Sequence, residues 1–228
     1  MGGAFGEAFK LIFSGDSIVW QIIGLTFKMT LISSVLSLII GVPIGVWLGI
    51  SNFKGRKIII AIDRALEGLP PVVCGLFCFL LFSGVGPLGG LHLLYTVTGM
   101  VIAQILLLLP MAVGLVETYI NGFATTFKES AKGMGLKKGR SLLLLINESR
   151  YNIISTYLFL LGRALAEVGA VSIVGGAIMF KTNVMTTAIM NYTSMGNFKT
   201  ALALGIILLF FGLLINIVMA FLQGEMDK

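Results

Sequence analysis

Charged residues are scarce in this chain of 228 residues: Asp, Glu, Lys and Arg make up 11% of it, and hydrophobic residues make up 57%. Average soluble domains are about 25% charged, because the outer shell of a water-soluble fold must be hydrated. The mean hydropathy is +1.01. This composition excludes a soluble globular domain, a disordered chain and a disulfide-stapled secreted module, and it predicts a polytopic membrane protein.

Residue types that carry metal or redox chemistry are also few. The single histidine, His92, has no partner for a metal site. The two cysteines, Cys74 and Cys78, lie on consecutive turns of one apolar run, and we expect them to be small buried thiols. The sequence G-x-x-x-x-G-K-[ST] does not occur, so the chain does not bind ATP phosphates through a P-loop. We predict no catalytic residues, no metal site and no cofactor bound by this chain.

What the chain does contain is five apolar stretches, each long enough to cross a bilayer as a helix, which takes about 20 residues. They do not alternate as the strands of a membrane barrel do, so we predict an all-α polytopic fold. The predicted spans are residues 26–50, 58–82, 95–120, 153–179 and 201–222. They form one membrane domain, residues 26–222, which is followed by a short tail, residues 223–228.

The first 25 residues are predicted to be a separate extracytoplasmic segment. Within it Phe5, Phe9 and Phe13 recur at helical spacing ahead of Ser14-Gly15-Asp16. This pattern favours an amphipathic helix that lies at the membrane interface. A short sixth span is the alternative.

The distribution of Lys and Arg predicts the orientation. In a five-span arrangement ten of these residues lie outside the membrane on one side and three on the other. The positive-inside rule places the side with ten in the cytoplasm. The net charge of +6 therefore belongs to loops and does not indicate a nucleic-acid partner. The N-terminus is predicted outside and the C-terminus inside.

Glycine spacing predicts one helix contact. Gly41, Gly45 and Gly49 form a GxxxGxxxG stripe in the first span, with Pro43 inside it. Glycines at this spacing let two helix backbones approach closely, so we expect this face to pack on another helix.

Charged residues inside two predicted spans need an explanation, because a lone charge at the bilayer centre costs at least ~2.5–3.5 kcal/mol. Arg64 and Glu67 are three positions apart and can pair, and Arg163 and Glu167 are four positions apart and can also pair. Either these pairs hold the structure together or they line a gate or a pathway. A pathway for an anion favours arginine and disfavours free carboxylates, so Glu167 is better explained as the partner of Arg163 than as a substrate contact.

A helix break is predicted directly after the first of these pairs. Pro70 and Pro71 lack the N–H groups that would satisfy carbonyls one turn earlier. A broken helix is tolerated in a membrane only where it is buried in protein or lines a wet cavity. The candidate gate or pathway residues are therefore Arg64, Glu67, Pro70, Pro71, Arg163 and Glu167.

The longest predicted cytoplasmic segment, residues 121–150, carries the most informative motif. A helical stretch, TTFKESAKGMG, precedes a basic turn, LKKGRS. Such a protrusion has few apolar residues to bury by itself, so it is either a docking element for a soluble partner or an ordinary solvated loop.

The order of residues in this segment resembles the E-A-A-x-x-x-G motif of ABC importer permeases. The matching residues are Glu129, Ser130, Ala131 and Gly135, with Gly133 inside the motif and serine in place of the usual alanine at position 130. The segment precedes the penultimate span, as it does in type I permeases. The family's frequent I-x-L-P ending is replaced here by Leu145-Ile146-Asn147-Glu148.

Further stretches are similar to the permeases of tungstate importers, which are relatives of the molybdate and sulfate permeases. These stretches are GLPPVV at 68–73, GRALAEVGAV at 162–171, TNVMTTAI at 182–189 and GNF at 196–198. The resemblance implies a homodimeric pore in the inner membrane, a separate ATPase dimer that holds ATP and Mg²⁺, and an extracytoplasmic binding protein that delivers the anion. It also implies that residues 129–135 act as the coupling helix that contacts the ATPase.

Two other classes remain open at this point. A secondary carrier would show two broken helices in corresponding positions, and the sequence predicts only the one at Pro70-Pro71. A membrane scaffold would have no pathway, which the charged pairs and the proline break disfavour. Tungstate, molybdate and sulfate are similar tetrahedral dianions, and no residue in the sequence distinguishes them.

Overall fold

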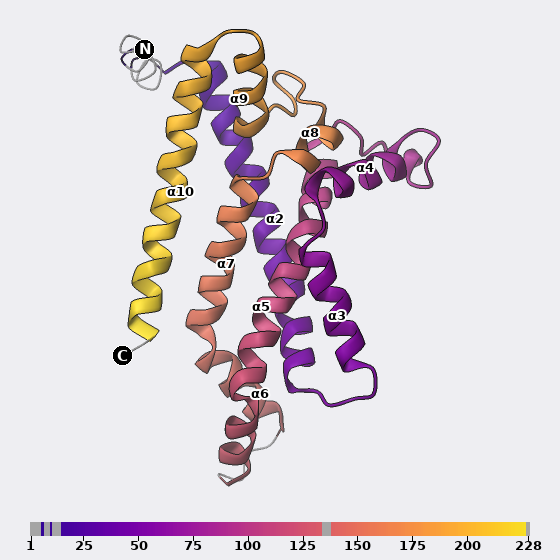
Figure 1. Ribbon diagram of the computed structural model, residues 1–228, viewed down its shortest axis with the longest axis vertical. Coiled ribbons are helices and arrows are strands. Elements are labelled where there is room, and N and C mark those ends of the chain that lie inside the picture. Colours follow the sequence, from indigo (N-terminus) through magenta and orange to yellow (C-terminus); the bar gives the residue numbers. More distant parts are fainter. Residues whose placement is uncertain (1–5, 7–9, 11–14, 134–137, 227–228) are drawn as a thin grey trace.

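The computed structural model describes residues 6, 10, 15–133 and 138–226, and every regular element in this part of the chain is helical. The predicted all-α class is confirmed. The helices are α2 (Ser17–Ile50), α3 (Arg56–Glu67), α4 (Pro71–Phe82), the short 3-10 helix η1 (Gly89–Leu91), α5 (Val97–Gly133), α6 (Lys138–Glu148), α7 (Arg150–Leu165), α8 (Gly169–Gly175), α9 (Met185–Ser194) and α10 (Phe198–Met226). Figure 1 shows α2, α5, α7 and α10 along the long axis of the molecule, α3 beside α5, and α4 projecting sideways.

The helix of the first predicted span, α2, begins at Ser17 rather than at the predicted residue 26. The Asp16 carboxylate accepts hydrogen bonds from the backbone N–H groups of Ile18 (2.9 Å) and Val19 (3.1 Å). These bonds satisfy two of the donors that a helix start leaves unpaired, which is why the helix can begin there. Residues 17–25 are therefore part of α2, and the side chains of the predicted amphipathic repeat, Phe5, Phe9 and Phe13, lie outside the described residues.

Three described helices are long and apolar enough to cross a bilayer: α2, the part of α5 at Val97–Gly122, and the part of α10 at Phe198–Leu222. Two bent helix pairs bring this number to five if each pair counts as one span. The pair α3 and α4 is bent by 97° and the pair α7 and α8 by 57°. The second predicted span is thus broken at the prolines as expected. The break in the fourth span was not predicted.

The glycine stripe of α2 packs against α5, as predicted. A Cβ atom on Gly41 would lie 2.5 Å from the Cβ of Ala112, and one on Gly49 would lie 2.7 Å from the Cγ2 of Ile120. Between them, a Cβ on Gly45 would lie 2.8 Å from the backbone oxygen of Val113. The two helices therefore approach too closely for any side chain on this stripe.

Replacing Gly45 with alanine is expected to destabilise the protein by about 1–3 kcal/mol, because the added methyl group meets backbone that cannot move without shifting α5. Gly24→Ala on the same helix is the matched control, since nothing lies within 4 Å of a Cβ at that position. Thermal denaturation of both purified variants in detergent measures the difference. Equal melting temperatures would show that the stripe does not set the α2–α5 distance.

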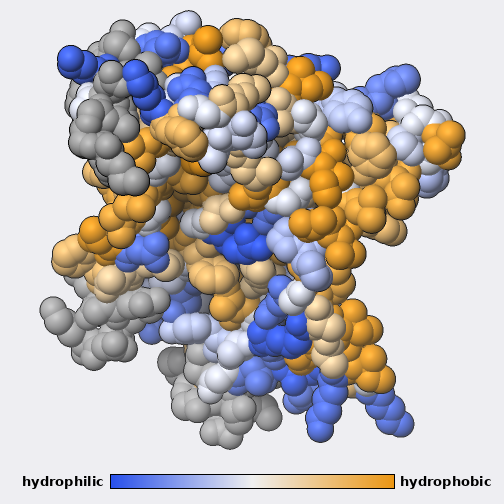
Figure 2. All heavy atoms as spheres, turned by 45° about the horizontal axis from the view of Figure 1, so that its top comes forward, coloured by the Kyte–Doolittle hydropathy of each residue, from blue (hydrophilic) through white to orange (hydrophobic). Residues whose placement is uncertain are grey.

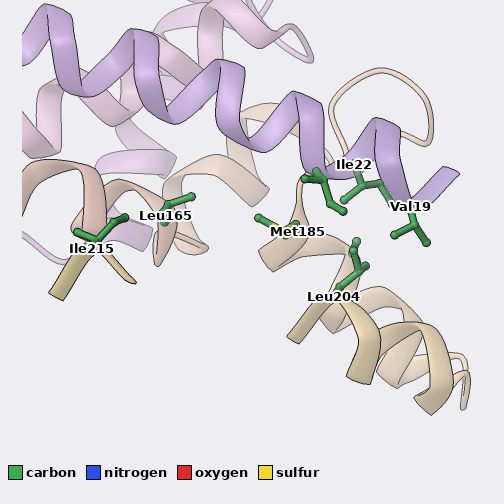
Figure 3. Packing of buried hydrophobic residues seen from close by; sticks show 8 residues of the cluster. Val19, Ile22, Leu165, Met185, Leu204 and Ile215 are labelled. Atoms are coloured by element: carbon green, nitrogen blue, oxygen red, sulfur yellow. The ribbon is translucent and has the colours of Figure 1, made fainter. Parts of the chain in front are cut away.

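A second core joins the start of α2 to the last third of the chain. Figure 3 shows Val19 and Ile22 of α2 facing Met185 and Leu204, and places Leu165 and Ile215 in the same cluster. The backbone N–H of Met185 also donates to the hydroxyl of Thr26 over 2.8 Å. The segment 180–199, predicted as an external loop, therefore contains a helix, α9, that packs against the spans. The pKa of the Tyr192 phenol in α9 is raised, mainly by burial and to a smaller extent by the negative charge of Asp16.

The surface away from these contacts is largely apolar. Figure 2 shows hydrophobic residues over much of one face, with hydrophilic residues near its middle, in its lower part and along its upper edge. On α4 the exposed side chains are Val72, Val73, Leu76, Phe77 and Leu80. Such a surface is suited to contact with lipid or with other membrane helices.

Candidate functional site

The first candidate group lies where α3 meets α5. Arg64 and Glu67 pair as predicted, with the guanidinium Nη1 3.0 Å from the Glu67 carboxylate. Arg64 also donates through Nη2 to the backbone oxygen of Gly114 (3.2 Å) and to the hydroxyl of Thr118. The pair is therefore linked to α5 and does not belong to α3 alone.

Gly114 makes this contact possible. A Cβ atom at this position would lie 1.9 Å from Oε1 of Glu67 and 3.0 Å from both Nη1 of Arg64 and Oδ2 of Asp63. The polar side chains of α3 thus rest directly on the backbone of α5. Any larger residue at position 114 would displace them.

Glu117 is the residue of this group that the sequence prediction missed. Its carboxylate is 7% exposed and lies 2.7 Å from Arg56 and 3.6 Å from Arg64. Carboxylates are rare inside membrane spans, so the position of Glu117 in the predicted span 95–120 was a signal that could have identified it as a candidate. Arg56, which was assigned only to a loop, in addition donates to the backbone oxygen of Leu48 (2.7 Å) and to the side-chain oxygen of Asn121 (3.0 Å).

The first helix break follows this group directly. The helix α3 ends at Glu67, and Pro71 is the first residue of α4, where its missing N–H costs nothing. The oxygen of Pro70 accepts from the N–H groups of Val73 (3.0 Å) and Cys74 (3.1 Å) and so begins the new helix. The turn of 97° carries the chain from the side of α5 into the arm formed by α4.

The second candidate group stands at the break between α7 and α8. Arg163 and Glu167 pair at 2.9 Å, as predicted from their spacing, and Glu167 is almost fully buried while Arg163 is 30% exposed. Glu167 also accepts from the N–H of Ala170 (3.2 Å), and the hydroxyl of Thr186 donates to the Glu167 backbone oxygen (3.0 Å). The Glu167 carboxylate thus neutralises Arg163 and accepts from a backbone N–H that the start of α8 would otherwise leave unpaired. This contact is the physical reason that the helix can break between α7 and α8.

The two breaks lie side by side. A Cβ on Gly169, at the start of α8, would lie 3.1 Å from the backbone nitrogen of Val72, at the start of α4. A Cβ on Gly75 would lie 2.7 Å from the Cα of Ala170. The candidate residues from the second and fourth predicted spans therefore belong to one region of the fold, although about 100 positions separate them.

A buried amide anchors the end of α7 to this region. Gln104 on α5 is fully buried, donates to the backbone oxygen of Ala164 (2.7 Å) and accepts from the hydroxyl of Ser33 on α2 (2.7 Å). It joins three helices with one side chain. The sequence prediction missed it because an isolated glutamine in an apolar run carries no local pattern.

The motif segment continues the longest helix. The helix α5 is unbroken from Val97 to Gly133, so Glu129, Ser130, Ala131 and Gly133 lie on its end. Gly135 lies outside the described residues. The helix predicted for this segment is present up to Gly133, and Lys138, part of the predicted basic turn, is the first residue of α6.

Other predicted features have simple positions in the structure. Cys74 and Cys78 are free and buried, as expected, and exposed His92 follows η1 with a left-handed backbone (φ 50°). Among the described residues no group of three or more His, Cys, Asp or Glu side chains is arranged to hold a metal ion.

Comparison with known proteins identifies the family. Residues 41–228 match the family model described as the binding-protein-dependent transport system inner membrane component. This chain belongs to that family. It is a multi-pass protein of the prokaryotic cell membrane and a permease component, and the family implies a separate ATPase and a binding protein.

Individual relatives agree with this assignment. The chain is 35% identical over 221 residues to the tungstate uptake system permease protein TupB of Peptoclostridium acidaminophilum, covering 97% of both chains. It is 34% identical to the TupB of Campylobacter jejuni, covering 94% of this chain and 90% of that protein. It is 28% identical to the sulfate transport system permease protein CysW of Synechocystis, covering 84% of this chain and 71% of that protein.

A solved structure shows the same fold. A chain of the inward-facing MetNI methionine ABC transporter matches with a TM-score of 0.73 and 17% identity, covering 92% of this chain and 98% of that chain. The fold is therefore that of an ABC type I importer permease.

Proposed function

We propose that this chain is the permease subunit of an ATP-driven importer that moves tungstate across the cell membrane. The observation that carries the proposal is the similarity to a tungstate permease over 97% of both chains. The similarity to the sulfate permease covers less of both chains and is lower in identity. Molybdate and sulfate are the alternative anions.

The proposed complex has two copies of this chain, an ATPase dimer on the cytoplasmic side and an extracytoplasmic binding protein that delivers the oxyanion. The permease performs no bond chemistry. The motif residues Glu129–Gly135 would contact the ATPase, and this is supported by the place of Glu129, Ser130, Ala131 and Gly133 on the protruding end of α5. Selectivity would rest mainly with the binding protein.

The proposed orientation puts this end of α5 in the cytoplasm. In Figure 1 the basic loop between α2 and α3 and the helix α6 lie toward the same end of the molecule as the end of α10, and α2 begins at the opposite end. The positive-inside rule assigns the basic end to the cytoplasm. Five passes, with the two bent pairs each counted as one, place the two ends of the chain on opposite sides.

In this mechanism ATP binding closes the ATPase dimer and moves the coupling end of α5, and the helices then rock as rigid bodies to alternate access to the pathway. The candidate gate is the region where the two breaks meet, with Arg64, Glu67, Pro70 and Pro71 on one side and Arg163 and Glu167 on the other. The pairing of Arg163 with Glu167 supports weak attraction of an anion, since the charge of Arg163 is already neutralised by a carboxylate.

The secondary-carrier alternative was disfavoured by the single predicted break and by the lack of an internal repeat in the sequence. The prediction of a single break is wrong, because the described residues contain two bent helix pairs. The family match, over residues 41–228, now decides in favour of an ABC permease. Uptake into vesicles that lack any ATPase would reverse this decision.

The direct test is co-purification of this chain with its ATPase and binding protein, followed by an ATPase assay. The binding protein loaded with tungstate is expected to raise hydrolysis above the basal rate, and the same protein loaded with sulfate is expected to raise it less. If only the sulfate-loaded or only the molybdate-loaded form stimulates hydrolysis, the proposed substrate is wrong. If no ATPase co-purifies, the proposed complex is wrong.

A further inference from the structure

The helix α3 is held to α5 by polar contacts. It has no buried residues, and its apolar side chains Ile58, Ile62 and Leu66 are exposed. Its polar side chains Arg56 and Arg64 face α5 instead. This reverses the usual amphipathic arrangement, in which the apolar face packs against the protein. The position of α3 relative to α5 therefore depends on hydrogen bonds and ion pairs.

The acceptors on α5 form one stripe. Gly114, Glu117, Thr118 and Asn121 follow the i, i+3, i+4, i+7 spacing that puts residues on one helix face. Glu117 is at the centre of the stripe, and its two carboxylate oxygens reach different arginines of α3, Oε1 to Arg56 and Oε2 to Arg64. A nearly buried carboxylate shared by two guanidinium groups is a directional link, because water does not screen it fully.

Glu117 lies on the same stretch of helix as the motif. From Glu117 to Glu129 the helix rises about 18 Å, at about 1.5 Å per residue. The proline in α5, Pro110, precedes Glu117. No proline occurs between Glu117 and Glu129. The part of α5 that carries Glu117 therefore continues without a proline-induced kink into the segment that carries the motif.

The other end of the link leads to the helix breaks. Arg64 is in the last turn of α3, directly before the break at Pro70-Pro71. The first turn of α4 then contacts Gly169 at the start of α8. A displacement of α3 is thus passed to both breaks through covalent connection and close packing.

We propose that Glu117 is a positioning residue for energy coupling: through Arg56 and Arg64 it makes α3 follow the motif-bearing end of α5, so that movement at the ATPase contact reaches the two helix breaks. This rests on the proposed function of the chain as an ABC importer permease. Glu117 contacts neither the anion nor the nucleotide in this role. The exposed apolar face of α3 lets the helix move against its lipid or protein surroundings without breaking specific contacts.

The test uses the complete complex with its ATPase and binding protein in proteoliposomes. Glu117→Gln keeps the shape of the side chain and removes the charge. The tungstate transported per ATP hydrolysed is expected to fall roughly fivefold, within the range by which coupling residues act, while the ATPase rate itself changes little. Asp16→Asn is the matched control, because it also neutralises a carboxylate but leaves a side chain that can still cap α2. An unchanged transport-to-hydrolysis ratio in Glu117→Gln would overturn the proposal.

Hydrogen–deuterium exchange gives a readout that does not depend on the anion. In the wild-type complex, ATP with vanadate is expected to change exchange in residues 64–73, and in Glu117→Gln this change is expected to be lost. If both proteins respond equally, Glu117 does not transmit the movement. If the two respond differently but the wild type transports no tungstate, the proposed substrate fails and the role of Glu117 stands.

A second variant covers the case in which Glu117→Gln does not assemble. Arg64→Lys keeps the charge but loses the planar fork that reaches Glu67, Gly114 and Thr118 together. It is expected to lower the same ratio. Full coupling in assembled Arg64→Lys would contradict the proposal. In a double mutant with Glu117→Gln the two effects should not add, because both substitutions break one network.

Discussion

Replacing residues 128–136 with a Gly/Ser linker of equal length is expected to reduce transport to background while the chain still inserts into the membrane. The reason is mechanical: the described part of this segment, up to Gly133, is the end of the continuous helix α5, and a flexible linker cannot pass on a rigid-body displacement. Gly135→Pro is expected to have the same effect, since proline excludes the conformations that glycine supplies after a helix. Uptake of tungstate into proteoliposomes is the measurement.

Insertion and assembly serve as the controls for this experiment. The amount of variant in the membrane fraction and its melting temperature are expected to match the wild type, because the buried cluster around Val19, Met185 and Leu204 lies in α2, α7, α9 and α10, and none of these helices contains the replaced segment. A linker variant that binds the ATPase and transports at the full rate would show that this segment is not the coupling element.

Glu167→Ala is expected to destabilise the protein by about 3 kcal/mol, because breaking a buried ion pair by removing one partner leaves an uncompensated charge. The variant loses the 2.9 Å contact to Arg163 and the acceptor for the Ala170 N–H at the start of α8. Thermal denaturation in detergent and transport in proteoliposomes are both expected to fall, since the α7–α8 break loses the group that satisfies it.

A double variant separates the charge from the packing. Replacing Arg163 with methionine in the Glu167→Ala background is expected to recover part of the lost stability, because it removes the unpaired guanidinium. Glu167→Ala as stable as the wild type would mean that the pair contributes nothing to the fold. A double variant less stable than Glu167→Ala would mean that Arg163 has another partner that matters more.

Both ion pairs that spacing predicted are present in the structure, and the reason is that they are local. Residues three or four positions apart in a helix lie on one face whatever the rest of the chain does. The same holds for the glycine stripe at Gly41–Gly49, which needed only a partner helix, and for the prolines at 70 and 71, which break a helix by their own geometry. The sequence did not show which helix the stripe meets.

The residues that were missed make contacts across long separations. Glu117 reaches Arg56 and Arg64, Gln104 reaches Ser33 and Ala164, and in each case the partners lie more than 50 positions away. No periodicity in one stretch of sequence reports such a contact. The second break was missed for a related reason, because the groups that satisfy it include Thr186, which α9 brings to it from another part of the chain.

The sequence by itself determined that the chain is a helical membrane protein of the ABC permease family, because composition, span length and motif order are properties of residues in a row. Only the tertiary structure decided that the two helix breaks adjoin and that α3 rests its polar face on α5. These contacts depend on how closely separate helices approach, and that distance is set by glycines such as Gly45, Gly114 and Gly169, whose effect appears only when the facing helix is in place.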